Sequence, residues 1–198
     1  NHTMDDDAAN SIEDEDYDIE QYRCDICRNH YATGDNQIVF CEGCDLGVHQ
    51  QCYGAPLTIE IPENEWFCDR CKFQQQHEKC VLCPETNGIM KRTSDWKWAH
   101  LSCAQWIPET YFCVPAGLDC IDYLQVPTHR FNRECMHCQK TNGATMNCCT
   151  AHCNNCFHIT CGLNHNIYLK YQQNKKGTDL IVAYCEEHTS KFETKNKK

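Results

Sequence analysis

The chain has 198 residues, enough for one to three small domains, and 20 of them are cysteine. Its formal net charge is −10, and the acids concentrate in the first half: residues 1–75 hold 17 acids and 4 bases, whereas residues 76–198 hold 11 acids and 14 bases. No apolar run is long enough for a signal peptide or a transmembrane helix, and the cysteines fall in Cys-x2-Cys pairs that histidines complete. The composition argues against a secreted disulfide scaffold and a membrane protein, and it predicts a metal-binding protein of a reducing compartment.

Residues 1–20 contain nine acids and no lysine or arginine. Almost nothing in this segment can be buried, so we expect a disordered acidic tail. The preferred interpretation is a spacer, and the alternative is an internal competitor for a basic ligand.

Residues 21–75 contain four pairs of metal-ligand residues, seven Cys and one His in all. Zn²⁺ takes four such ligands in a tetrahedron, so two zincs are predicted, and the short linkers between pairs favour an interleaved pairing. One zinc is then held by Cys24, Cys27, His49 and Cys52, and the other by Cys41, Cys44, Cys68 and Cys71. Gln37–Phe40 is predicted as a strand, a second strand is expected near Val48, and residues 69–76 are expected to form a short helix.

The order of these ligands, with Trp66 two residues before Cys68, resembles a PHD finger. A RING finger has a similar cross-brace, but its His usually comes earlier in the ligand series and it lacks this Trp. The segment is therefore interpreted as a PHD finger.

Residues 76–106 contain four further ligands that suffice for one zinc, namely Cys80, Cys83, His100 and Cys103. The surrounding segment, Trp98–Pro108, resembles the zinc knuckle that joins two PHD fingers in the bromodomain-PHD scaffold, JADE and AF-type families.

Residues 107–190 contain a second set of eight ligands, six Cys and two His. By the same cross-brace, one zinc is held by Cys135, Cys138, His158 and Cys161, and the other by Cys148, Cys153, Cys185 and His188. Residues 143–148 and 157–161 resemble an extended PHD finger. Cys149 is an alternative to Cys148 as ligand, and only the family spacing favours Cys148. Residues 170–179 are predicted as a surface loop, and residues 191–198 as a basic tail.

The predicted fold is a small zinc-stabilised α+β protein in which a PHD finger, a knuckle and an extended PHD finger contain short two-stranded antiparallel sheets and short helices. Its twenty ligands make five structural zincs per chain. Four cysteines are left over and are expected to be small buried hydrophobes: Cys113, Cys120, Cys149 and Cys156.

No enzymatic function is predicted. A catalytic zinc keeps an open coordination position, whereas each predicted zinc has four protein ligands. The enzymatic alternative is a RING-like ubiquitin ligase, and the structural alternative is a zinc scaffold that docks other subunits.

The family resemblance implies a nuclear chromatin reader that binds the tail of histone H3 and targets a histone-modifying complex. PHD fingers of this family add the N-terminus of H3 to a sheet edge as a strand. The expected histone-binding residues are Asp35, Asn36, Gln37, Ile38, Val39, Phe40, Glu42, Glu63, Asn64 and Trp66.

Among these residues, Glu42 matches the acid that pairs with the arginine at the second position of the tail. The carbonyls of residues 61–65 would accept the free amine, and Asp35 or Asn36 would meet the lysine at the fourth position. No aromatic residue stands at 45–48, so unmodified lysine is expected rather than methyl-lysine. The alternative, drawn from the AF-type relatives, is an internal H3 segment read by both fingers.

Weak binding of nucleosomal DNA is expected from the second half of the chain. Lys91, Arg92 and Lys97 cluster between the ligand pairs of the knuckle, and further lysines border residues 170–179. The alternative is that these bases only keep the protein soluble.

Overall fold

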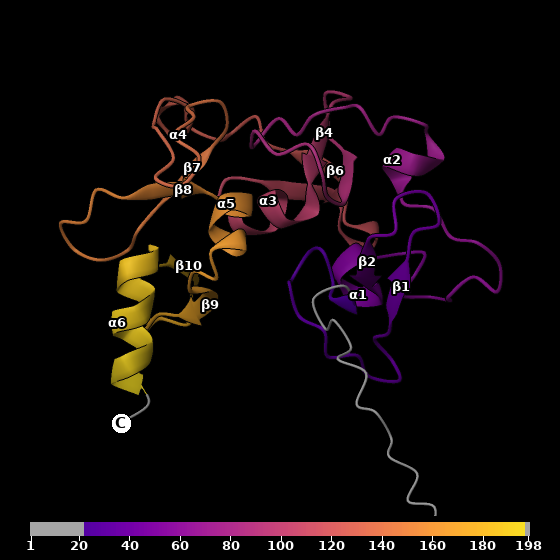
Figure 1. The fold of residues 1–198 in the computed structure, drawn as a ribbon, viewed down its shortest axis with the longest axis horizontal. Coiled ribbons are helices and arrows are strands. Elements are labelled where there is room, and N and C mark those ends of the chain that lie inside the picture. Colours follow the sequence, from indigo (N-terminus) through magenta and orange to yellow (C-terminus); the bar gives the residue numbers. More distant parts are fainter. Residues whose placement is uncertain (1–21, 197–198) are drawn as a thin grey trace, which may run out of the picture.

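The computed structural model describes residues 22–196, so the predicted acidic tail, residues 1–20, lies outside the described part (Figure 1). Five separate two-stranded antiparallel sheets and a few short helices make up the fold, which confirms the predicted fold class. The first finger lies on one side of the molecule, the second finger and the C-terminal helix lie on the other, and the knuckle lies between them (Figure 1). Within residues 22–196, no helix is both long and apolar enough to cross a bilayer.

One local unit, a hairpin followed directly by a helix, occurs three times. The first copy is β1 (Ile38–Phe40), β2 (Gly47–His49) and α1 (Gln50–Tyr53), the second is β3 (Met90–Arg92), β4 (Trp98–His100) and α3 (Leu101–Trp106), and the third is β7 (Thr145–Asn147), β8 (Cys156–His158) and α5 (Ile159–Asn164). In each copy a His ends the second strand with extended backbone and is the N-cap residue of the helix. The predicted strands near residues 37–40 and 48 correspond to β1 and β2.

The remaining elements lie between these units or follow the third one. They are α2 (Asp69–Lys72), β5 (Tyr111–Val114), the 3₁₀ helix η2 (Pro115–Gly117), β6 (Asp119–Asp122), α4 (Thr128–Phe131), β9 (Leu169–Gln173), β10 (Asp179–Ala183) and α6 (Glu186–Asn196). The helix expected over residues 69–76 is therefore shorter than predicted. The expected basic tail begins inside α6 rather than after it.

The prediction of a surface loop over residues 170–179 is wrong, because this stretch belongs to a five-pair hairpin, β9–β10. Its turn is held by Asn174, whose side-chain oxygen accepts the N–H groups of Lys176 and Thr178, and by Gly177 at φ +76°. Residues 170–180 are all exposed, so the strands carry no alternation of apolar and polar residues that would reveal them.

Buried polar contacts fasten the first finger to the knuckle. Lys91 of β3 is 1% exposed; its ammonium lies 2.8 Å from a carboxylate oxygen of Asp119, donates to the carbonyl of Gly117, and sits 4.2 Å from the centre of the Tyr53 ring. Asp25 of the first finger accepts the backbone N–H of Ile89 at 2.7 Å. The first finger and the knuckle therefore form one packed body.

The second finger joins the knuckle in the same way. The backbone N–H of Ala144 donates to the carbonyl of Leu82 at 2.9 Å, next to Gly143 at φ +128°, where an added Cβ would come within 2.8 Å of the Cys83 backbone. Only glycine fits this close approach of two chains. The ring of Tyr171 also stacks on Trp106 with centroids 4.7 Å apart.

The expectation that all four leftover cysteines are buried holds for one of them. Cys156 is 4% exposed and its thiol donates to the carbonyl of Glu134. Cys113 and Cys149 are exposed and Cys120 is half-buried, because they lie on hairpins and loops that project from the small cores.

Candidate zinc centres and peptide-binding edge

Five groups of four Cys or His side chains converge among the described residues. In each group the ligand atoms lie within 4.8 Å of one another. The structure brings together the same sets that the sequence predicts: Cys24, Cys27, His49 and Cys52; Cys41, Cys44, Cys68 and Cys71; Cys80, Cys83, His100 and Cys103; Cys135, Cys138, His158 and Cys161; and Cys148, Cys153, Cys185 and His188. Each finger therefore interleaves its ligand pairs, and the knuckle uses a single set.

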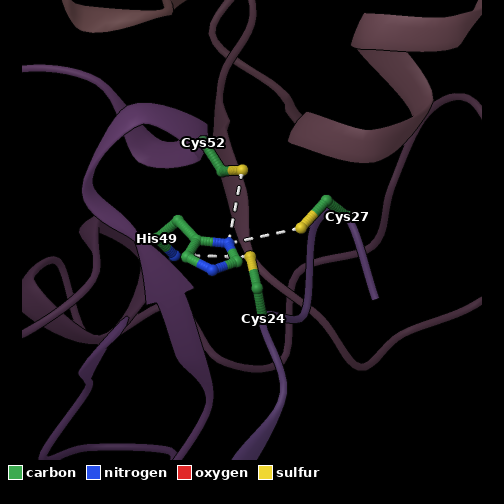
Figure 2. Close-up of side chains that lie close together, drawn as sticks. All are labelled: Cys24, Cys27, His49 and Cys52. Carbon is green, nitrogen blue, oxygen red and sulfur yellow. Dashed lines mark hydrogen bonds between the residues drawn. The ribbon is translucent and has the colours of Figure 1, made fainter. Parts of the chain in front are cut away.

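The three repeated units present their histidines identically. In the first finger, Nδ1 of His49 lies 3.3 Å from Sγ of Cys27 and 3.8 Å from Sγ of Cys52, and the backbone N–H of His49 donates to Sγ of Cys24 (Figure 2). His100 and His158 have matching contacts, with Nδ1 at 3.2–3.9 Å from two thiols. Tetrahedral zinc bound by sulfur and nitrogen separates such ligands by about 3.6 Å, so the arrangement fits this metal.

The second nitrogen of two of these histidines has a partner that fixes the ring. Nε2 of His49 lies 2.8 Å from the carbonyl oxygen of Tyr31, and Nε2 of His100 lies 2.7 Å from that of Asn87. A carbonyl accepts only from a protonated nitrogen, so Nδ1 is left with the lone pair that a metal needs. These carbonyl partners come from loops, and no sequence pattern indicated them.

The thiols in both sets of the first finger are arranged to hold negative charge. Hydrogen bonds from the thiols of Cys27 and Cys52 lower the pKa of Cys24, and hydrogen bonds from Cys44 and Cys68 lower the pKa of Cys41. The same contact with Cys41 raises the pKa of Cys44 to about 12. In both sets of the first finger, one sulfur thus accepts hydrogen bonds from the neighbouring thiols, and a metal cation would take the place of those protons.

The positions of the two cysteines favour Cys148 over Cys149 as the metal ligand. Sγ of Cys148 is buried and lies 3.5 Å from Nδ1 of His188, which is also 3.1 Å from Sγ of Cys185. Cys149 is exposed, and its sulfur accepts the backbone N–H of Ala183 instead.

β1 has one edge that pairs with no strand in the described chain, and Figure 1 shows it beside β2 alone. The backbone N–H of Gln50 donates to the carbonyl of Gln37, and that of Cys41 donates to the carbonyl of Leu46. Backbone groups alternate in direction along an antiparallel strand, so those of Ile38 and Phe40 point away from β2. This edge can accept an added peptide strand.

An acidic hollow lies just past the C-terminal end of β1. It is lined by Glu42, Glu63, Asn64, Glu65 and Phe67, all exposed. The backbone N–H of Glu42 donates to the carbonyl of Trp66 at 2.9 Å, which holds the two segments together. Three carboxylates around one hollow favour a cationic ligand.

The N-terminal end of β1 carries Asp35 and Asn36. The hydroxyl of Thr33 donates to the carboxylate of Asp35 at 2.7 Å and lowers its pKa, so this exposed group stays charged. The side-chain oxygen of Asn36 accepts the backbone N–H of Gln51, which anchors the loop to α1.

The placement of Trp66 corrects one predicted contact. Its side chain is 8% exposed and its ring meets Tyr53 edge-on, with centroids 4.9 Å apart. Trp66 therefore supports the finger from inside and is not a surface contact.

The structure removes Lys91 from the predicted DNA-binding cluster, and DNA binding by Arg92 and Lys97 stays a prediction. Lys91 is buried in the contact with Asp119, because alternation along β3 turns its side chain into the interface. The guanidinium of Arg92 lies over the Trp98 ring at 4.4 Å, and Lys97 pairs with Asp95 at 2.9 Å. The three bases do not form one exposed patch.

Comparison with known proteins places these features in a family. Residues 24–71 match the PHD-finger family, and residues 78–188, more than half of the chain, match the PHD-zinc-finger like domain. Protein Jade-1 of Xenopus laevis is 35% identical over 192 residues, which is 96% of this chain and 22% of that protein. Bromodomain and PHD finger-containing protein 3 of Mus musculus is 38% identical over 177 residues, 84% of this chain and 14% of that protein. The chain thus spans less than a quarter of the length of either relative.

A solved structure agrees with the sequence relatives. The crystal structure of zebrafish PHF14-PZP superposes with a TM-score of 0.70 and 28% sequence identity, and the match covers 87% of this chain and 91% of that one. The His tautomers and thiol clusters described above fit the zinc that such domains bind. The chain therefore belongs to the family of zinc-binding proteins in which a PHD finger, a zinc knuckle and an extended PHD-like finger form one module.

Proposed function

We propose that this chain is a nuclear chromatin reader whose first finger binds the N-terminal tail of histone H3, with unmodified lysine at the fourth position. The observation that supports this proposal best is the unpaired edge of β1 beside the acidic hollow. Main-chain hydrogen bonds to such an edge give affinity, and the groups at its ends select the peptide.

The charges around β1 suit a basic peptide that runs antiparallel to it. Its free amine would enter the acidic hollow near Glu63 and Asn64, and an arginine at the second position would meet Glu42. A lysine at the fourth position would reach Asp35, whose carboxylate is charged. Pairing with both ends of β1 requires a peptide that begins at the hollow, which favours the N-terminus of the tail over an internal segment.

The preference for unmodified lysine rests on the aromatic residues near β1. Tyr22 contacts the Phe40 ring at 6.1 Å, and Tyr31 stacks on His30 at 4.5 Å. Residues 45–48 add no ring. Methylation would remove N–H donors and add bulk beside the acids without gaining an aromatic cage.

A titration with four peptides tests this proposal. The unmodified N-terminal H3 peptide should bind with a dissociation constant of micromolar order, about −7 to −8 kcal/mol. Acetylating its amine should abolish binding, and trimethylating the fourth residue should weaken it. Tighter binding of a peptide from the internal part of the tail would favour the AF-type alternative.

We also propose that the five sets hold five structural zincs. Each set supplies four ligands, which leaves no open position for catalysis, so we propose a binding module rather than an enzyme. We further propose that binding of the histone tail targets a histone-modifying complex to chromatin.

A second candidate function is weak, sequence-independent DNA binding by the second finger. The turn and first strand of the β9–β10 hairpin carry three exposed lysines, Lys170, Lys175 and Lys176. Exposed lysines on a projecting hairpin can approach a phosphate backbone, whereas the buried Lys91 cannot.

A further inference from the structure

Two cysteines outside the five zinc sets face each other across the β5–β6 hairpin. The register pairs Phe112 with Ile121, so the next residues inward, Cys113 and Cys120, stand opposite each other. Residues directly opposite in an antiparallel pair have Cα atoms about 4.5–5.5 Å apart, within the roughly 4.4–6.8 Å range of disulfides. Both are free thiols.

The pair is accessible to a small oxidant. Cys113 is exposed and Cys120 is half-buried. The neighbouring Cys113 thiol raises the pKa of Cys120 to about 11, so Cys120 is the member of the pair that retains its proton. Cys120 also has φ +55°, a left-handed conformation that is uncommon for a residue with a Cβ.

The pair lies next to the tip of the hairpin, and this tip contacts the first finger. The tip of the hairpin, η2, meets the first finger through a hydrogen bond of 2.9 Å from the Ala55 N–H to the carbonyl of Ala116. The carbonyl of Gly117 accepts from the buried Lys91. A covalent link between the two strands would stiffen the hairpin that carries this tip.

We propose that Cys113 and Cys120 form a thiol-oxidation site that peroxide converts into a reversible intramolecular disulfide. The Cys113 thiolate attacks one oxygen of hydrogen peroxide, the O–O bond breaks, and the departing hydroxide takes up a proton to give water and a sulfenic acid. The Cys120 sulfur then attacks the Cys113 sulfur, the S–O bond breaks, and a second water leaves with the Cys120 proton. The two sulfurs lose two electrons in all, and the peroxide gains them.

Zinc binding should make the ligand cysteines react with peroxide more slowly than Cys113. Their thiolates would be bound to zinc and most of them are buried, whereas the Cys113 sulfur is exposed and has a resolving thiol opposite it. Oxidation of the pair should therefore precede zinc release.

The experiment treats the zinc-loaded chain with increasing hydrogen peroxide and follows free zinc with a chromogenic chelator. Samples are denatured, alkylated with N-ethylmaleimide and cut with trypsin, which places Cys103, Cys113 and Cys120 on the peptide 98–130. We expect this peptide to carry one maleimide and to lack two hydrogens before zinc appears, and dithiothreitol should restore three maleimides.

Single substitutions test whether the disulfide forms between Cys113 and Cys120 rather than with another thiol. Cys113→Ser should abolish the disulfide, Cys120→Ser should leave a sulfenic acid on Cys113 that dimedone traps, and Cys149→Ser should change nothing, although Cys149 is also exposed. The proposal is overturned if zinc is released before the disulfide forms, or if the peptide still loses two hydrogens in Cys113→Ser. Formation of dimers linked through Cys113 in place of the internal bond would overturn it too.

Discussion

In the proposed function, Glu42 is the side chain on which peptide selection should depend most. It stands between two ligands of one zinc set, yet its carboxylate is exposed and lines the acidic hollow. Glu42→Lys replaces attraction with repulsion at the arginine position and should cost about 2 kcal/mol or more of peptide binding, with all zincs retained. Isothermal titration calorimetry measures the loss.

Glu60→Lys is the matched control, since Glu60 is an exposed acid of the same finger outside the hollow. It should change the affinity little. Equal losses in both variants would mean that Glu42 acts only through the overall charge of the finger.

A substitution of His49 tests the metal centres at the scale of a single residue. Its Nδ1 faces two thiols and its Nε2 is bound by the Tyr31 carbonyl, so His49→Ala should remove one zinc and unfold the first finger. A structural zinc supplies on the order of 10 kcal/mol of folding free energy in such modules. Zinc analysis and NMR of the first-finger amides check this, and His30→Ala, which alters an exposed ring outside every set, should keep all zincs.

Lys91 links three elements and should matter for stability rather than for DNA. Lys91→Ala leaves the Gly117 carbonyl without its donor and removes the ion pair with Asp119. We expect a loss of about 2 kcal/mol in the free energy of unfolding. Lys97→Ala removes a solvent-exposed ion pair and should lower the free energy of unfolding much less in the same denaturant titration. Similar values for the two variants would contradict the assigned role of Lys91.

The β9–β10 hairpin is where DNA contact is expected. Replacing Lys170, Lys175 and Lys176 with Glu should remove DNA binding at low salt, whereas Arg92→Glu with Lys97→Glu should preserve most of it. For the native chain, affinity should fall with salt with a log–log slope of about −0.9 per phosphate neutralised. If neither the triple nor the double variant alters the shift in a mobility-shift assay, the hairpin lysines only solubilise the protein.

Elements tied to metal-ligand spacing were predictable, and elements without such spacing were not. β1 and β2 followed from an apolar run beside Cys41 and from Val48 before a ligand His. The exposed polar strands β9 and β10 gave no periodic signal, and Lys91 looked like a surface base because its acceptor, Asp119, lies 28 residues away in sequence. Trp66 marked the family correctly but lies in the core. Long-range partners of this kind depend on tertiary packing, which sequence spacing does not record.

At the scale of the whole molecule, zinc binding should supply the stability that larger domains obtain from an extensive hydrophobic core. The five sheets have two strands each, and a two-stranded hairpin alone is marginally stable at best. Elemental analysis should give close to five zincs per chain, and a strong chelator should unfold all three parts together, because Asp25, Lys91 and Gly143 join them. A ratio of four or fewer would remove one of the proposed sites.

The central claim is that a peptide with a free N-terminus adds a strand to β1. Amide hydrogen exchange by NMR tests it directly, because the N–H groups of Ile38 and Phe40 point to the open edge while that of Val39 points to β2. The unmodified H3 peptide should slow exchange at Ile38 and Phe40, and the N-acetylated peptide should not. Unchanged exchange at both amides under saturating peptide, with protection appearing only in the second finger, would contradict the account.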